Sequence, residues 1–196
     1  MDARFAHLAL IAATVLLVAV MFLLPSWSFD GSSMVEHTTS HLGAQGSPHA
    51  WVMNVTFVLV GVATLLAAWR KLADHPLPLL VIGAFALSLV LMGFYRHEPL
   101  VAGGETNSFE ARRHSLFATT TGFSFVLFAV SMIFVSRRGR DRVLAAAVAA
   151  LSTLLSIGMA TLPDLMGLWQ RTIFVMAFVW LIHVTSERYA LVEPGS

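Results

Sequence analysis

Six long apolar stretches constrain what this chain can fold into more than any other feature of its sequence. They run roughly over residues 5–24, 52–69, 77–94, 116–135, 143–162 and 168–184. A helix needs about 20 predominantly apolar residues to cross the hydrocarbon core of a bilayer, where its backbone polar groups must be satisfied internally. The pattern predicts an all-α integral membrane bundle of six transmembrane helices, formed as one domain by residues 1–196.

The composition excludes most soluble folds. Hydrophobic residues make up 57% of the chain and charged residues 12%, against about 25% charged in an ordinary soluble domain. The formal net charge of +1 provides no field that would attract nucleic acid. Because the chain has no cysteine, disulfides, thiol nucleophiles and thiolate metal ligands are excluded as well.

Proline marks several ends of the predicted helices. Pro25 and Pro163 directly follow the first and fifth spans, where a proline does not have to supply a helical N–H. Ser47 and Pro48 predict an N-cap and a first helical residue for the second span. The apolar core of residues 5–24 is longer than that of a signal peptide, so we expect the first helix to be retained.

The basic residues predict the orientation of the bundle. The side that holds both termini carries eight of them: Arg4, Arg70, Lys71, Arg137, Arg138, Arg140, Arg142 and Arg188. The opposite side, here called the outer side, carries four: Arg96, Arg112, Arg113 and Arg171. Lys and Arg concentrate on the cytoplasmic side of membrane proteins. We therefore expect both termini to be cytoplasmic and the chain to lie in the inner (plasma) membrane.

This orientation places most of the titratable side chains on the extracytoplasmic side. They are His37, His41, His49, His97, His114, Asp30, Glu36, Glu98, Glu105, Glu110 and Asp164. The loops after the first and third spans are long, whereas compact connections have a median of about 4–6 residues. Long loops that carry such side chains are often functional.

The loop after the first span predicts a short helix with a candidate metal site. Ser33 followed by Glu36 is a capping-box pattern, and Gly43 is a suitable C-terminal residue for a helix. On such a helix His37 and His41 share a face, and imidazoles at this spacing can bind zinc or another divalent metal. The alternative is that these histidines lie at the membrane interface and bond to backbone or lipid.

The loop after the third span repeats these features. Gly103 and Gly104 predict a flexible turn, and Asn107 with Glu110 is a second capping-box pattern. Glu110 and His114 then lie one helical turn apart, which suits an acid–base pair. The alternative for Glu110 is a surface ion pair worth about 0–1 kcal/mol.

Two arginine positions on the outer side are candidate anion-binding sites. Arg112 and Arg113 either bind a lipid phosphate or lie among headgroups. Arg171 begins the sixth span, so it either extends outward to the interface or pairs with a carboxylate, with Asp164 and Glu110 as the candidate partners.

Three segments together resemble a prokaryotic six-span membrane family known as domain of unknown function 998. The first is TTSHLGAQGSPHAWVMNVTFVLVG, which carries the family's motif positions at Ser40, Leu42, Gly43, Ala44, Pro48 and Asn54. The others are RRHSLFATTTGFSF, with His114, and GLWQRTIFVMAFVWLI, with Gly167 and Arg171.

The resemblance implies the six-span fold and no established activity. One departure is that relatives carry an acidic residue after the motif serine, where this chain has His41. Either side chain can ligate a metal, but histidine is a poor partner for Arg113 or Arg171.

The leading hypothesis is a pocket on the outer side that binds, and as an enzyme would act on, an anionic lipid headgroup or similar amphiphile. The candidate catalytic residues are His114, His41 and Ser40, the candidate binding residues are Asn54, Arg113, Arg171, Asp164 and Glu110, and the candidate zinc ligands are His37 and His41. Asn54 is costly to expose to lipid, so we expect it to point inward beneath the first outer loop. The predicted partners are membrane lipids and other membrane subunits, but not nucleic acid.

Two non-enzymatic alternatives remain open. An accessory subunit of a larger membrane complex would bury a broad apolar face against its partner. A small transporter or sensor would need a polar path to the cytoplasmic side, and the sparse polarity of that half of the spans speaks against it. Recovery of a bound lipid, metal or partner would distinguish these functions.

Overall fold

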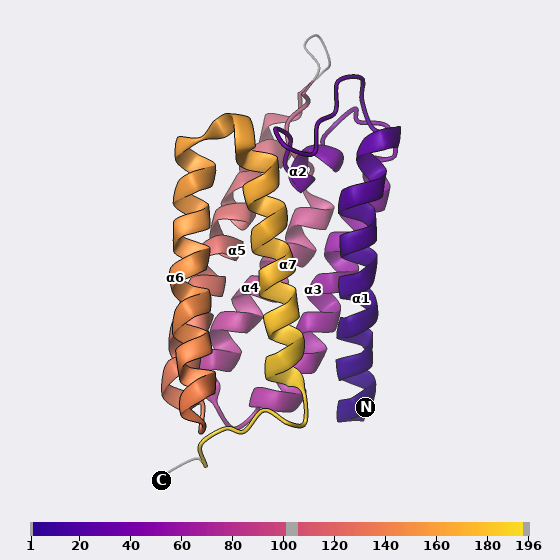
Figure 1. Cartoon of the computed structure of the whole chain (residues 1–196). Helices are drawn as coiled ribbons and strands as arrows, with labels where there is room; N and C mark the ends of the chain where they lie inside the picture. Colours follow the sequence, from indigo (N-terminus) through magenta and orange to yellow (C-terminus); the bar gives the residue numbers. More distant parts are fainter. Residues whose placement is uncertain (1, 101–105, 194–196) are drawn as a thin grey trace.

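The computed structural model describes residues 2–100 and 106–193, so the turn predicted at Gly103 and Gly104 lies outside the described residues. Six long helices make up the bundle (Figure 1): α1 (Ala3–Leu23), α3 (Ala50–Leu72), α4 (Pro76–Phe94), α5 (Ser108–Val135), α6 (Gly139–Thr161) and α7 (Met166–Thr185). Three short elements lie between them: η1 (Leu24–Trp27), α2 (Thr39–Leu42) and η2 (Pro163–Leu165).

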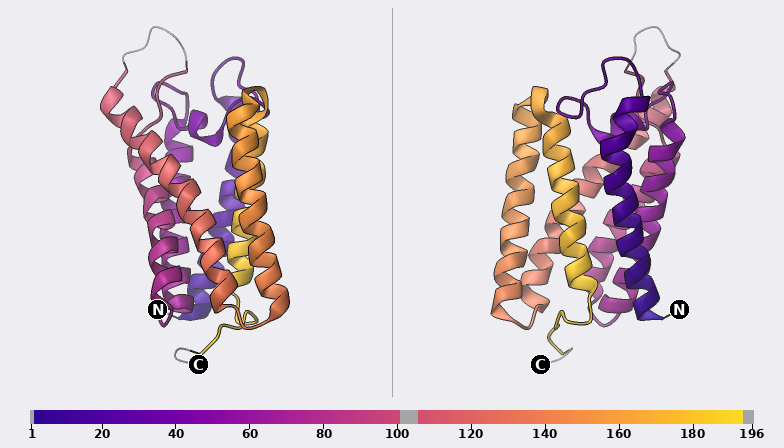
Figure 2. Two further views of the ribbon diagram at one scale, coloured as in Figure 1. Left: turned by 90° about the vertical axis from the view of Figure 1, so that its left-hand side faces the viewer. Right: turned by 45° about the vertical axis from the view of Figure 1, so that its right-hand side comes forward.

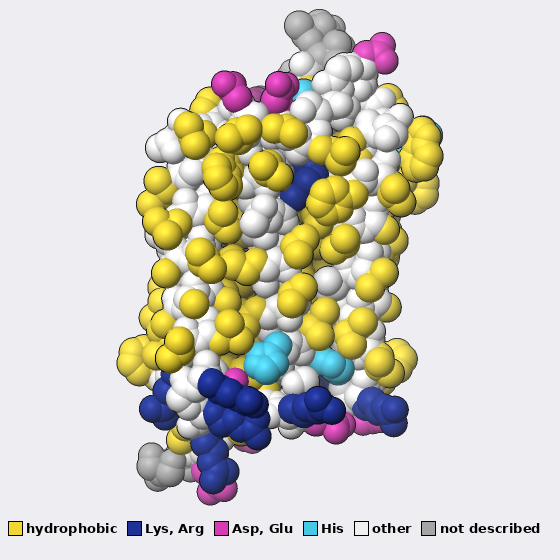
Figure 3. Space-filling model, in the orientation of Figure 1, with side chains coloured by type: hydrophobic (Ala, Val, Ile, Leu, Met, Phe, Trp, Pro, Cys, Tyr) yellow, Lys and Arg dark blue, Asp and Glu magenta, His cyan; other side chains and the backbone are white. Residues whose placement is uncertain are grey.

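The six-span architecture predicted from the sequence is confirmed. Within the described ranges, six helices are long and apolar enough to cross a membrane. Consecutive helices run in opposite directions, so both termini lie at one end of the bundle and the α1–α3 connection lies at the other (Figures 1 and 2). Hydrophobic side chains cover the middle of the surface, and Lys and Arg gather at the end with the termini (Figure 3). We call this the basic end and the opposite one the outer end.

One predicted helix start is wrong, and the predicted cap at Asn107 is confirmed. α3 begins at Ala50 after His49, whose φ of 56° is left-handed, so the predicted start at Ser47 and Pro48 is wrong. The Ser47 hydroxyl instead donates to the His41 carbonyl oxygen at 3.3 Å, which leaves it no role as a cap. α5 begins at Ser108, earlier than its apolar stretch, because the Asn107 side chain accepts hydrogen bonds from two backbone N–H groups of the first turn.

Helices α3 and α4 pack closely against each other. A Cβ atom added at Gly61 would lie 2.6 Å from the Ala86 carbonyl oxygen, and one added at Gly93 would meet the backbone of Asn54. Glycine at these positions therefore lets the two backbones approach, as small residues do at helix crossings in membranes. This contact fixes the position of Asn54 beneath the first outer loop.

The chain after α7 packs against the turn between α5 and α6. The Arg137 N–H donates to the Ala190 carbonyl oxygen at 2.9 Å, and the Val192 N–H donates to the Val135 carbonyl oxygen at 2.9 Å. The Tyr189 hydroxyl is hydrogen-bonded to Ser136. Burial raises the pKa of Tyr189, so its hydroxyl stays protonated. These bonds close the basic end of the bundle.

Candidate functional site at the outer end

The first outer loop forms two separate turns rather than the predicted continuous helix from Ser33 to Gly43. The Ser33 hydroxyl accepts from the Glu36 N–H at 3.2 Å, and the first turn ends there. Thr38 then caps α2. The break follows from the histidines, because His37 Nδ1 accepts the Ser33 N–H at 3.0 Å and His41 Nδ1 accepts the Thr38 N–H at 3.2 Å. Each imidazole thus caps its own turn.

Arg171 holds this loop against the helices. Its side chain is 2% exposed, and its Nε donates to the Met21 carbonyl oxygen on α1 at 3.0 Å. Its Nη1 donates to the carbonyl oxygens of Met34 at 2.8 Å, His37 at 2.7 Å and Gly167 at 3.1 Å. Both predicted alternatives for Arg171 are therefore wrong, since the guanidinium neither extends outward nor pairs with Asp164 or Glu110. Its acceptors are instead backbone carbonyl oxygens of α1, α7 and the first outer loop.

The two carboxylates predicted as partners of Arg171 lie elsewhere. Asp164 is exposed in η2. Glu110 accepts hydrogen bonds from Arg96 at 2.9 and 3.2 Å, so the surface ion pair forms rather than an acid–base pair with His114. Over residues 2–100 and 106–193, Arg171 therefore has no carboxylate partner, and its Nη2 has no hydrogen-bond acceptor. A buried positive charge of this kind is costly unless an anion compensates it.

Four imidazole rings form a continuous row beside this arginine. The ring centroids are 5.6 Å apart between His37 and His41, 4.8 Å between His41 and His97, and 5.3 Å between His97 and His114. We call these residues the histidine row. It joins the first outer loop, the α4–α5 connection and the start of α5, so the predicted residues His41 and His114 do come together, bridged by His97.

Hydrogen bonding fixes the tautomers of the two central candidates. His114 is 1% exposed, and its Nδ1 donates to the Tyr95 carbonyl oxygen at 2.7 Å, so its Nε2 is a bare acceptor. That Nε2 is buried and, among the described residues, has no partner. In His41 the Nδ1 is the acceptor, so the Nε2 carries the proton. Burial, followed by the neighbouring His97, lowers the pKa of His41 to about 3 and keeps it neutral.

The predicted zinc ligands His37 and His41 do not share a helix face. Their Nδ1 atoms are taken by backbone N–H groups, which leaves one nitrogen on each ring. In the part of the chain that the structure describes, no group of three or more His, Cys, Asp or Glu side chains is arranged to hold a metal ion. A structural or catalytic zinc site takes three or four protein ligands.

The remaining predicted residues divide between the interior and the surface. Ser40 is buried in α2. Asn54 is 8% exposed and donates to the Gly43 carbonyl oxygen at 3.2 Å, so its predicted inward position beneath the loop is confirmed. Its Oδ1 is buried and has no partner within the described ranges. Arg113 is exposed, with its guanidinium carbon 4.9 Å from the ring centre of Phe109, and is directed away from the interior.

Two glutamines that we did not predict fix the loops in place. Gln45 joins the two long outer loops, since its Oε1 accepts the Asn107 N–H at 2.8 Å and its backbone N–H donates to the His97 carbonyl oxygen at 2.9 Å. Gln170 on α7 accepts both the N–H and the hydroxyl of Thr39 at 2.7 Å. Neither glutamine belongs to a recognisable motif. The sequence signal that could have identified them is a polar side chain next to an apolar stretch.

An apolar groove of about 400 Å³ lies on the side of the bundle just below this loop. It runs between α3 and α4 and is lined by Trp51, Asn54, Val55, Val58, Leu59, Gly93, Phe94 and Arg96. Asn54 and Arg96 are its polar residues and belong to the outer end. The other side chains of its wall are apolar, and Gly93 contributes backbone. Asn54 thus lines the groove and bonds the loop at the same time.

A family model described as "Protein of unknown function (DUF998)" matches residues 11–187. The chain belongs to this family. The resemblance seen in the three sequence segments is thereby confirmed, and the matched residues of this DUF998 protein include all six helices in whole or in part. No curated protein and no solved structure matches the chain. The buried motif residues Ser40, Asn54, His114 and Arg171 all lie at the outer end.

Proposed function

We propose that this DUF998 protein binds an anionic lipid headgroup, or a similar amphiphile, at its outer end. The observation that carries this proposal is Arg171, a buried cation whose acceptors are neutral carbonyls and whose Nη2 is unused within the described residues. A phosphate or carboxylate at Nη2 would compensate the charge through a charge-assisted hydrogen bond. Lipid phosphates are the anions that every membrane supplies next to such a site.

The histidine row and Asn54 narrow the ligand to one that also donates hydrogen bonds. His114 Nε2 and Asn54 Oδ1 are both buried acceptors without a partner among the described residues. A ligand that satisfies them needs hydroxyl or amine groups beside its anionic group. Phosphorylated headgroups with a free hydroxyl or amine meet both requirements, whereas a bare fatty acid meets only the first.

The groove between α3 and α4 supports a ligand with an apolar chain. It is open on the lipid-facing side, with Trp51 and Phe94 each 67% exposed. An acyl chain in this groove would begin beside Asn54, which reaches both the groove and the loop. Pockets that combine an apolar wall with a few convergent polar groups are typical ligand sites.

The proposed orientation has both termini in the cytoplasm and the histidine row outside, in the inner (plasma) membrane. It rests on the excess of Lys and Arg at the basic end (Figure 3). A ligand from the outer leaflet would then have direct access to the groove.

Binding is favoured over catalysis at this site. An efficient general base has a pKa near the working pH, whereas the pKa of His41 is about 3. His41 is therefore a weak base at neutral pH, and His114, the other candidate base, is 1% exposed and closed to solvent.

Purification in mild detergent, followed by mass spectrometry of co-purifying lipids, metals and proteins, tests the proposal. We expect a phospholipid in about equimolar amount, retained by an Arg112→Gln variant and lost from His114→Leu and Arg171→Gln variants. Arg112 is the matched control because it is exposed and its Nε donates to the Ser108 carbonyl oxygen of its own helix. His114→Leu keeps the proposal falsifiable if Arg171→Gln does not fold.

Two results would overturn it. One is recovery without lipid in a stoichiometric complex with other membrane proteins, which would identify an accessory subunit. The other is recovery without lipid but with zinc that is lost in a His37→Ala/His41→Ala variant, which would identify a metal site.

A further inference from the structure

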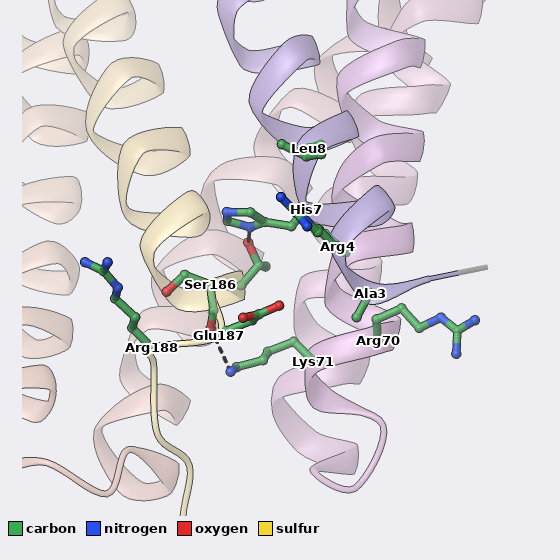
Figure 4. A pocket seen from close by; sticks show the side chains of 11 residues that line it. Ala3, Arg4, His7, Leu8, Arg70, Lys71, Ser186, Glu187 and Arg188 are labelled. Atoms are coloured by element: carbon green, nitrogen blue, oxygen red, sulfur yellow. Dashed lines mark hydrogen bonds between the residues drawn. The ribbon is translucent and has the colours of Figure 1, made fainter.

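A second cavity, of about 460 Å³, opens at the basic end (Figure 4), whereas the histidine row lies at the outer end. It lies between the start of α1, the end of α3 and the segment that follows α7. Its titratable lining residues are Arg4, His7, Arg70, Lys71, Glu187 and Arg188. Four permanent cations therefore face one carboxylate among the described residues that line it.

Two contacts give this cavity fixed walls. Lys71 Nζ donates to the carbonyl oxygens of Ser186 at 2.8 Å and Tyr189 at 2.7 Å, which ties α3 to the chain beyond α7. His7 Nδ1 is 3.0 Å from the Thr185 hydroxyl oxygen, which ties α1 to α7. Since the Thr185 hydroxyl donates to the Leu181 carbonyl oxygen, His7 is the donor in this second contact. The cationic side chains thus surround a preformed space.

The three arginines add positive charge around that space. Arg4, Arg70 and Arg188 are all exposed, and Arg70 and Arg188 extend from opposite sides of the cavity (Figure 4). Guanidinium groups bind phosphate with two parallel hydrogen bonds. Leu8 and Ala67 add an apolar part to the wall, on the helices that face the bilayer.

We infer that this cavity binds a phosphate-bearing anion at the basic end, at a site separate from the proposed outer one. The observation behind it is the cavity lined by Arg4, Arg70, Lys71 and Arg188, with Glu187 as the one carboxylate among the described lining residues. Glu187 attracts the Lys71 ammonium and lies near it at the cavity (Figure 4). The carboxylate would therefore compete with an incoming phosphate for the same positive charge, so Glu187 lowers the affinity of the site.

The phosphate has two possible sources, which share this chemistry. One is an anionic phospholipid of the adjacent leaflet, since basic pockets between transmembrane helices bind such headgroups. The other is a soluble phosphate compound. Titration of the full chain, in nanodiscs of phosphatidylcholine, with dihexanoyl phosphatidic acid and separately with inorganic phosphate distinguishes them. Binding of the lipid alone identifies a lipid site, and binding of both identifies a general phosphate site.

Charge-reducing variants test which residues form the site. We expect Arg4→Gln/Arg188→Gln to bind dihexanoyl phosphatidic acid about 30-fold more weakly, since each basic residue near a membrane surface contributes about a factor of five. Glu187→Gln should bind several-fold more tightly. The matched control is Arg137→Gln/Arg140→Gln, which removes the same charge from exposed residues of the same end outside the cavity.

The inference is overturned if neither probe binds, or if the control variant loses as much affinity as the cavity variant. It is also overturned if Glu187→Gln weakens binding. All four substituted arginines are exposed, so these variants are expected to fold. Lipid retention at the outer end is measured on the same samples. If Arg171→Gln loses that lipid, binding of the phosphate probes at the basic end should stay unchanged.

Discussion

Arg171→Lys is the substitution that tests most directly whether a buried guanidinium holds the outer end together. The native side chain bridges the Met21 carbonyl oxygen on α1 and the Met34 and His37 carbonyl oxygens in the first outer loop. Lysine keeps the charge, but its ammonium is a single point and does not span α1 and the loop as the planar guanidinium does. We therefore expect Arg171→Lys to keep either the bond to α1 or the bonds to the first outer loop, but not both.

The magnitude follows from the number of acceptors. If the ammonium keeps two of the four carbonyl contacts, two buried carbonyls lose a donor at about 1–3 kcal/mol each. The expected loss in unfolding free energy is thus about 2–6 kcal/mol. For a chain of this length, 1 kcal/mol corresponds to about 2–4 °C in unfolding temperature.

Two measurements follow this change in the purified full chain. Tryptophan fluorescence gives the unfolding temperature in detergent. The chain has no cysteine, so an Ala44→Cys reporter at a fully buried loop position gives the rate of thiol labelling. We expect Arg171→Lys to lower the first and raise the second, with Arg112→Lys as the control. Unchanged unfolding temperature and continued protection of the thiol would refute the role assigned to the guanidinium.

Three further perturbations have expected outcomes. Because the fold lowers the pKa of His41 from its ordinary value of 6.5 to about 3, the unfolded chain binds more protons between these values, and stability falls as pH decreases through this window. Allowing for partial exposure, the loss is about 1–3 kcal/mol in a urea titration between pH 7 and pH 4. Gly43→Ala places a methyl group on the Asn54 amide and should cost about 1–3 kcal/mol by thermal unfolding. Tyr189→Phe removes the bond to Ser136 and should cost about 1 kcal/mol, with faster proteolysis of the C-terminal segment.

Each of these outcomes has a matched control. A His41→Gln variant should lose less stability over the same pH window, and an equal loss would assign the pH effect to other groups. Gly122→Ala adds a methyl group inside α5 where nothing lies within 4 Å, so it should not lower the unfolding temperature. If Gly43→Ala behaves like Gly122→Ala, the contact with Asn54 is not a constraint. Equal proteolysis of Tyr189→Phe and the native chain would show that the hydroxyl does not hold the segment.

The six spans were predictable because the bilayer imposes both length and backbone satisfaction on each helix. The hydropathy of residues 116–135 marked the apolar part of α5, but the helix starts at Ser108, where polar residues lie beyond the hydrocarbon. The Asn107 cap pointed to that start. At Ser47 and Pro48 the same kind of pattern failed, because the serine side chain bonds the loop and not the helix.

The outer end was predictable as a location, but its geometry was not. Topology alone places the loops after α1 and α4 at one end, so His41 and His114 were expected near each other. His97 was not a predicted site residue, because its place in the row depends on how Gln45 joins the two loops. The acceptors of Arg171 were invisible in the sequence, since main-chain carbonyls have no residue type. The sequence suggested the carboxylates of Asp164 and Glu110 as partners of Arg171, and in the structure Arg171 bonds neither of them.

The holding role of Arg171 and its proposed anion-binding role are compatible because they use different nitrogens. Nε and Nη1 are taken by carbonyl oxygens, whereas Nη2 has no acceptor within the described residues. Four carbonyl dipoles solvate the charge well enough to keep the guanidinium inside, but they add no negative charge. An anion at Nη2 would therefore strengthen the site without displacing any contact that holds the loop. It follows that ligand binding and loop attachment should increase together, since both lower the energy of the same buried cation.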